Sequence, residues 1–210
     1  LDPERAHNIE AGVNLAFNDV AFADDRLRLK ASAFHNRVSD YIDLDCFNFP
    51  LPGGCTYVNI DEAVLKGVEL EANYDMGRFY GILTGTFIES EDTENGEPLT
   101  NVPPSRISAT LGMRALAGKL DMGTTVHLVA DAPDADFFTL SGAGYGLLDA
   151  YASYSFDEDT ALTLTLNNIF DREYTQYLDL QPSPGFNARL SFERRFGGRP
   201  SFSNSERAAL

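Results

Sequence analysis

The chain has 210 residues, of which 43% are hydrophobic and 23% are charged, and this apolar content excludes a disordered chain. No apolar stretch approaches the length of about 20 residues that a transmembrane helix needs. Thirty-two acidic against sixteen basic side chains give a net charge of −16, which argues against a nucleic-acid partner. Two cysteines are too few for a disulfide-rich mini-fold or a zinc cluster. Because the chain opens on Leu1 without a signal-peptide pattern, we expect a piece of a longer protein.

Apolar and polar residues alternate with a period of two along most of the chain. This pattern is typical of β-strands, whose successive side chains point to opposite faces of a sheet. Nine segments carry it, and no helix of comparable quality is predicted. In chain order the predicted strands are residues 7–17, 26–42, 63–74, 79–89, 106–116, 119–130, 145–156, 160–170 and 186–196.

The connections between the predicted strands alternate in length. Tight turns containing Gly or Asp are found at 74–78, 116–119 and 156–160. Long connections are found at 43–62, 90–105, 131–144 and 171–185. Most predicted strands reach the length of about 9–11 residues that crosses a bilayer at a tilt. The sequence therefore predicts an all-β protein, an antiparallel transmembrane β-barrel with periplasmic turns and external loops.

A soluble β-sandwich binding module is the alternative from another class, because sandwich strands also alternate. Long uniform strands, the strict order of loop lengths and aromatic residues at strand ends favour the barrel. Those aromatic residues are Phe17, Tyr41, Tyr74, Tyr145, Phe156, Phe170, Phe186 and Phe196. The absence of Trp counts against an interfacial aromatic girdle.

An odd number of strands has a further consequence. Bacterial single-chain barrels have an even number of strands, and lipid does not tolerate an open sheet edge. We therefore expect partner strands outside this sequence.

Four short motifs follow one another along the chain. They are PERAHNIEAG at 3–12, LKGVELE at 65–71, NVPP at 101–104, and NNIFDREY at 167–174 with PGF at 184–186 before a strand that ends at Phe196. In this order they resemble P-E-x-x-x-N-x-E-x-G, x-x-G-[VF]-E-x-E, N-[VT]-P-x-[HN] and N-N-[LI]-F-D-x-x-Y … P-G-R-x-[FL] of the TonB-dependent outer-membrane receptors. The resemblance covers nearly the whole chain.

The resemblance implies a 22-stranded barrel around an N-terminal plug, with residues 1–196 as its last nine strands and 197–210 as a tail. The plug and its TonB box would lie upstream. It also implies active transport, in which cargo binds the outer loops and plug apex, and the TonB–ExbB–ExbD complex pulls on the plug. Two departures stand out. Phe186 occupies the place of the family's usual Arg, and the tail follows the aromatic Phe196 that usually ends the family's protein.

Three features resemble the receptors that take heme from hemoglobin or a hemophore. Residues 57–63 match [YF]-x-N-x-x-x-A before the KGVELE strand, a cysteine-bearing loop spans 46–55, and residues 1–4 resemble the segment after a heme-ligating loop. Siderophore receptors share that last segment, so a ferric siderophore is the alternative cargo, and cobalamin or glycans remain open. The resemblance implies no intrinsic cofactor, no enzyme activity, and a place in the outer membrane of a Gram-negative bacterium.

Cys46 and Cys55 lie in the predicted outer loop at 43–62. An oxidising periplasm favours a disulfide between them, which would contribute about 2–3 kcal/mol. The alternative, a metal site, would need two more ligands, and no His lies in that loop. We predict the disulfide and no metal, and expect it to hold Phe47, Phe49 and Tyr57. These aromatics either contact a flat apolar ligand or simply pack within the loop.

Other candidate residues are weaker. Of the three histidines, His7 at the outer end of the first strand is the candidate ligand-binding residue, whereas His35 and His127 are expected to be polar lining. The acidic segment 89–97 lacks the spacing of a calcium loop and is expected to be solvated. Inward charges are expected to line the lumen and contact the plug: Glu69, Glu71, Arg114, Asp149, Arg189, Glu193 and Arg195. Ser141 lacks the strand–helix context of a nucleophile elbow.

Overall fold

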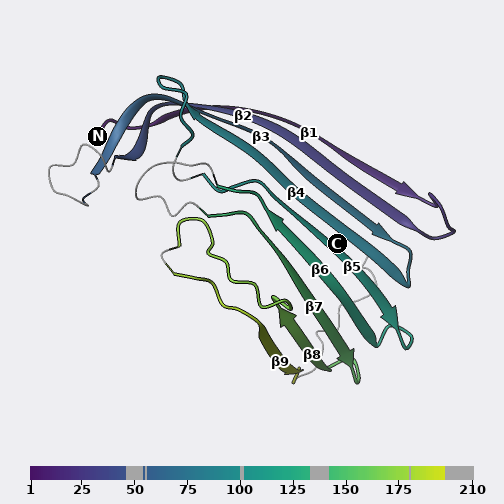
Figure 1. Cartoon of the computed structure of the whole chain (residues 1–210). Coiled ribbons are helices and arrows are strands. Elements are labelled where there is room, and N and C mark those ends of the chain that lie inside the picture. The colour runs from purple at the N-terminus through teal and green to yellow at the C-terminus, as the bar shows by residue number, and fades with distance from the viewer. Residues whose placement is uncertain (46–53, 55, 100–101, 133–141, 180, 197–210) are drawn as a thin grey trace.

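The computed structural model describes residues 1–45, 54, 56–99, 102–132, 142–179 and 181–196. Its nine strands form one antiparallel sheet in which each strand pairs with its neighbours in sequence (Figure 1). The strands are β1 (Arg5–Asn18), β2 (Arg26–Asp45), β3 (Thr56–Asp75), β4 (Phe79–Asp92), β5 (Arg106–Ala115), β6 (Leu120–Val129), β7 (Tyr145–Ser155), β8 (Thr160–Asn167) and β9 (Asn187–Arg194). Tight connections join the strands at one end, here called the turn end, and long ones join them at the loop end. Within the described residues, no helix is long and apolar enough to span a membrane.

One face of the sheet is apolar and uncovered. Directly paired residues share a face, so the register places Val13, Leu29, Leu83, Val126 and Leu164 on the same side. Large side chains on this apolar face remain accessible, with Leu111 71% and Phe192 68% exposed. Each described strand packs only against its sheet neighbours, so no second layer covers this face. A soluble sandwich would bury it between two sheets, so the sandwich alternative is wrong.

Strands β2 and β3 are longer than the predicted 26–42 and 63–74. Their ladder continues past Asp40, which has a positive φ of 56°, to the pair Asp45–Thr56. Two contacts support the extension: the Ile42 N–H donates to the Glu4 carboxylate at 2.8 Å, and the Asn59 amide donates to the Asp40 carbonyl at 2.5 Å. The predicted loop at 43–62 therefore shrinks to the residues between Asp45 and Thr56, and β2 and β3 project beyond their neighbours (Figure 1).

Strand β8 ends at Asn167, before the predicted limit at residue 170. Asn168 has a positive φ of 50°, and its side chain accepts from the Arg172 N–H and donates to the Arg172 carbonyl, both at 2.9 Å. The start of the NNIFDREY motif is therefore a closed turn rather than strand.

The predicted girdle aromatics do not all share one position. Tyr74 shares the apolar face with Leu27, and at the turn end of this face Tyr154 and Phe156 meet edge to face at 4.9 Å between ring centroids. Tyr145 instead lies on the opposite, polar face, and Tyr41 packs against buried residues at the loop end. The prediction that these two belong to an outward-facing girdle was wrong.

The buried core of the described chain sits at the loop end. Ala63, Leu99 and Val102 are almost fully buried, because the β4–β5 connection folds back over β3 and β4. The Thr93 N–H donates to the Glu62 carbonyl at 3.1 Å, and the Leu99 N–H donates to the Ser90 hydroxyl at 3.3 Å. The buried residues Leu99 and Val102 thus hold part of the predicted acidic segment 89–97 against the sheet.

A buried carboxylate organises the β1–β2 turn. Asp25 is 1% exposed, and it accepts hydrogen bonds from the N–H groups of Val20, Ala21 and Phe22 and from the Tyr74 hydroxyl. Burial opposes ionisation, but these four donors outweigh it and hold the pKa of Asp25 well below its ordinary value. The ionised carboxylate therefore stabilises the turn.

Replacing Leu99 should release the β4–β5 connection. We expect Leu99→Ala to cost roughly 2–3 kcal/mol of local stability, because it leaves a cavity in this small core. In the full-length protein, hydrogen exchange of the Asp92, Thr93 and Gly96 amides should accelerate. Leu111→Ala, at an exposed position of the apolar face, is the matched control and should leave these amides unchanged. Unchanged exchange in Leu99→Ala would contradict the anchoring role.

The Asp25 turn should respond to acid. Because the folded-state pKa lies below the unfolded value, the contribution of Asp25 is complete at neutral pH and declines as the pH falls below about 4. We expect Asp25→Asn to lower the unfolding midpoint at pH 7, and the difference from wild type to shrink at pH 3. Asp24→Asn, an exposed change in the same turn, should have little effect. A deficit that is equal at both pH values would contradict the ionic origin.

Candidate functional site

The polar face of the sheet is the candidate functional surface. One cross-strand row of this face runs through all nine strands, starting at the turn end of β1 and reaching the loop end of β8 and β9, in the order Asn18, Arg26, Asp75, Tyr80, Gly112, Gly123, Tyr151, Thr165 and Arg189. The register also places there the strand residues predicted to point inward, which are Glu69, Glu71, Arg114, Asp149, Arg189 and Glu193. The two faces of the sheet thus differ as a barrel wall requires.

A hydrogen-bonded network occupies the turn end of the polar face. The Tyr80 hydroxyl donates to the Asp121 carboxylate at 2.7 Å and contacts the Tyr151 hydroxyl. Arg114 donates to the Asp75 carboxylate at 2.9 Å, and its guanidinium lies 4.5 Å from the centroid of the Tyr80 ring. This network ties β3, β4, β5, β6 and β7 together and satisfies its charges internally.

Two glycines make room for the tyrosine rings. Tyr80 lies across Gly112, and Tyr151 lies across Gly123, where an added Cβ would meet the Tyr151 ring at 2.9 Å. Gly112 and Gly123 face each other across the β5–β6 hairpin. The sequence signal that could have revealed the network is this glycine pair, placed symmetrically about the tight turn.

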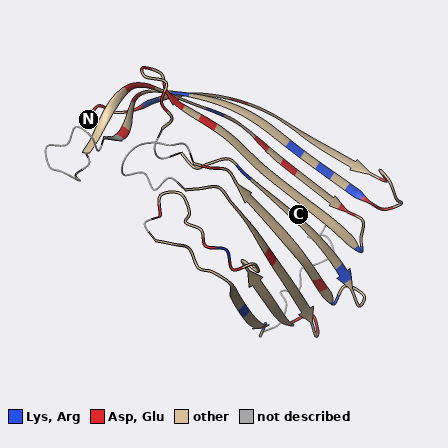
Figure 2. Ribbon diagram, in the orientation of Figure 1, with Lys and Arg blue, Asp and Glu red and all other residues tan. Residues whose placement is uncertain are grey.

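Charges nearer the middle of the polar face are uncompensated. Lys30 and Glu71 are directly paired across β2 and β3, yet no ion pair joins their side chains in the described structure. Glu69 lies beside them, and these residues border a pocket of about 160 Å³. Arg26, Arg28 and Lys30 give β2 a run of basic residues toward its turn end (Figure 2). Once enclosed, such charges would need counter-charges from another part of the protein.

His127 belongs to a short chain of contacts on the same face. Its Nδ1 lies 2.9 Å from the Ser108 hydroxyl, and its Nε2 lies 3.4 Å from the Asp149 carboxylate. Asp149 also accepts the Asn168 N–H at 2.8 Å, so the chain of contacts holds the start of the β8–β9 connection.

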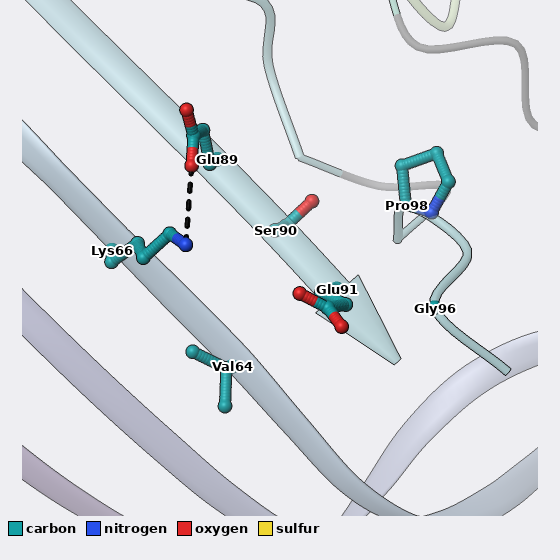
Figure 3. Close-up of a pocket in the computed structure, with 7 residues that line it drawn as sticks. All are labelled: Val64, Lys66, Glu89, Ser90, Glu91, Gly96 and Pro98. Carbon is teal, nitrogen blue, oxygen red and sulfur yellow. Dashed lines mark ion pairs between the residues drawn. The ribbon is translucent and has the colours of Figure 1, made fainter. Parts of the chain in front are cut away.

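The apolar face ends in a charged zone at the loop end. Lys66 on β3 pairs with Glu89 on β4 at 3.2 Å, and Figure 3 shows these two side chains meeting beside a pocket of about 260 Å³. Arg37 pairs with Glu62 at 3.5 Å. Val68 and Phe87 form the next cross-strand pair toward the turn end on the same face. The charged zone therefore marks the limit of the apolar surface on the side of the loop end.

The described residues include only two of the four predicted ligand-binding residues, His7 and Tyr57. Cys46, Phe47, Phe49 and Cys55 lie outside the described residues, so the disulfide and the aromatic tip stay predictions. Tyr57 lies near the loop end of β3 and is 64% exposed.

His7 lies at the loop end of β1, opposite Arg37, and its row continues to Val64 on β3. It therefore shares the side of the sheet that carries Ile9 and Val13 rather than the polar face. Tyr57 is seven residues farther along β3 than Val64, or about 23 Å at the rise of a strand. The ligand-binding role of His7 stays a prediction.

Comparison with known proteins identifies the family. A family described as TonB dependent receptor-like, beta-barrel matches residues 1–169. The chain is 29% identical over 212 residues to the heme/hemopexin utilization protein C of Haemophilus influenzae, covering 91% of this chain and 29% of that protein. It is also 29% identical over 187 residues to a hemin receptor of Yersinia enterocolitica, covering 83% of this chain and 27% of that protein.

Solved structures give the same result. The Serratia marcescens hemophore receptor HasR, determined with its hemophore HasA and heme, is 30% identical and superimposes with a TM-score of 0.73 over 93% of this chain and 32% of that chain. The copper transporter OprC shares the fold with a TM-score of 0.78 at 20% identity. The chain thus spans about three-tenths of the length of these relatives.

These relatives are receptors and transporters, which confirms the prediction that the chain does not belong to an enzyme. The match over residues 1–169, together with the antiparallel sheet and its uncovered apolar face, shows that the chain belongs to the TonB-dependent receptor-like β-barrel family.

Proposed function

We propose that this chain is part of an outer-membrane receptor of a Gram-negative bacterium that imports heme actively. In this proposal residues 1–196 supply the last nine strands of a closed, 22-stranded barrel around a plug, and residues 197–210 form a tail. The observation that carries the cargo is the relatedness over about nine-tenths of the chain to heme and hemin receptors. A ferric siderophore is the alternative cargo.

The extent of the apolar face supports a place in a membrane. On β1 the outward apolar residues run from Ile9 to Phe17, and on β4 from Phe79 to Phe87. Nine residues at about 3.3 Å each span roughly 30 Å, which a strand tilt of about 40° reduces to about 23 Å. The apolar band of outer-membrane barrels is about 25 Å tall.

Heme is favoured over a ferric siderophore by sequence identity rather than by fold. The hemophore receptor HasR is 30% identical to this chain, whereas the pyoverdine receptor FpvA is 19% identical. At the latter level the likeness concerns the fold alone. We therefore take heme, from hemoglobin or from a hemophore, as the proposed cargo.

The uncompensated charges of the polar face support a plug in the lumen. Lys30, Glu69 and Glu71 would find their counter-charges on that domain, which in turn would couple the barrel to the TonB–ExbB–ExbD complex. A Cys46–Cys55 disulfide would hold Phe47, Phe49 and Tyr57 at the outer mouth.

Hemin-dependent growth tests the proposed cargo. The full-length protein, expressed in a heme-auxotrophic Gram-negative host without a heme receptor of its own, should permit growth on hemin. Growth should cease when the host lacks TonB, because import needs energy from the inner membrane. Uptake of ferric siderophores without growth on hemin would favour the alternative cargo instead.

The proposed membrane orientation predicts unequal effects of two adjacent substitutions on β4. Leu83→Arg places a charge on the apolar face near the middle of the band and should cost about 2–4 kcal/mol. Thr84→Arg places the same charge on the polar face, beside Glu69 and Glu71, and should be tolerated. The measurement is the amount of folded, heat-modifiable protein in the outer membrane. Equal levels for the two variants would contradict the orientation.

A further inference from the structure

A second pocket lies at the loop end of the polar face. Arg106, Val129 and Tyr145 are directly paired across β5, β6 and β7, so they form one row on that face. This row lines a pocket of about 240 Å³, which is also lined by Pro103 and by residues of the β8–β9 connection such as Tyr177. The pocket therefore opens where the proposed lumen meets the outside.

Tyr145, an aromatic residue that lines the pocket, is supported by a ring from a second element. The rings of Tyr145 on β7 and Tyr174 in the β8–β9 connection lie 4.5 Å apart, centroid to centroid, with an angle of 42° between their planes. The Ser183 N–H donates to the Tyr174 carbonyl at 2.8 Å, which holds this part of the connection in place. Tyr145, held by its contact with Tyr174, thus presents a largely preformed aromatic edge to a flat ligand.

Arg106 supplies positive charge beside the tyrosine pair. Within the described residues its guanidinium makes no ion pair and no hydrogen bond, although Arg114 on the same strand and face is fully engaged with Asp75. The nearest carboxylate in its cross-strand row is Glu69, two strands away, or about 10 Å. The donors of Arg106 are therefore available to a ligand.

A guanidinium beside an aromatic ring, as Arg106 and Tyr145 provide here, suits one kind of ligand. A guanidinium binds a carboxylate through two parallel hydrogen bonds, and an adjacent aromatic edge favours a conjugated ring. The volume is below the range of about 300–1,000 Å³ that encloses a whole drug-sized ligand, so the pocket suits the edge of a larger one. We propose that this pocket binds the carboxylate-bearing edge of a tetrapyrrole, with Arg106 on the carboxylate and the Tyr145 ring, braced by Tyr174, against the ligand ring. This inference rests on the proposed import of heme.

Hemin and hemin dimethyl ester, which lacks the free carboxylates, distinguish the role of Arg106. With the purified full-length protein and absorbance titration, we expect Arg106→Ala to bind hemin about tenfold more weakly than wild type. Its affinity for the dimethyl ester should equal that of wild type. Arg106→Lys keeps the charge but loses the two-pronged geometry, so its affinity for hemin should lie between those of wild type and Arg106→Ala.

The control is Arg37→Ala, which removes an arginine from the other side of the sheet at the same loop end. It should bind both compounds as wild type does. The inference is overturned if wild type binds hemin and Arg106→Ala binds it equally well, or if Arg106→Ala weakens hemin and its ester alike. A wild-type protein that binds neither compound would contradict the proposed function itself.

Discussion

An apolar face on a single β-layer must be removed from water, and this constraint governs the whole structure. The described strands pair with their neighbours, apart from the outer edges of β1 and β9, and none of them covers residues such as Leu111 and Phe192. Hydrocarbon is a solvent in which such a face is stable, provided that every backbone donor and acceptor is paired. The zone of ion pairs around Lys66 and Glu89 then lies where the hydrocarbon ends.

The other face follows from the same constraint, because a wall with lipid on one side has a protected interior on the other. Near the turn end its charges are satisfied within the sheet, through Tyr80, Tyr151, Asp121 and Arg114. Farther up, Lys30, Glu69 and Glu71 are not, and at the loop end Arg106 is also available. We infer that the turn end of the polar face is a rigid, internally bonded part of the sheet. The part of this face nearer the loop end is where other parts of the protein and the cargo make contact.

The sequence predicted the parts of the fold that depend on local pattern. Alternation located all nine strands, and the tight turns implied their pairing, because a short hairpin fixes register. The extension of β2 and β3 was missed because it depends on distant contacts, such as that of Glu4 with Ile42, rather than on a clean alternation. The loop-end core was missed because Leu99 and Val102 follow an acidic segment that reads as solvated.

The candidate site was less predictable than the fold, because it depends on which residues meet across strands. The tyrosine network needs Gly112 and Gly123 to face each other, and the pocket at Arg106 needs a loop residue, Tyr174, to return to β7. Neither relation is visible in a local pattern. The proposed barrel closure, plug and cargo cannot be derived from these nine strands.

The orientation of the apolar face can be measured directly with spin labels. A nitroxide placed in turn at each residue of β6, in the full-length protein in lipid bilayers, reports its collision rate with dissolved oxygen, which concentrates in hydrocarbon. The account predicts a period of two, with high rates at Met122, Thr124 and Val126 and low rates at Gly123, Thr125 and His127. A flat profile, or high rates at the second set of residues, would contradict it.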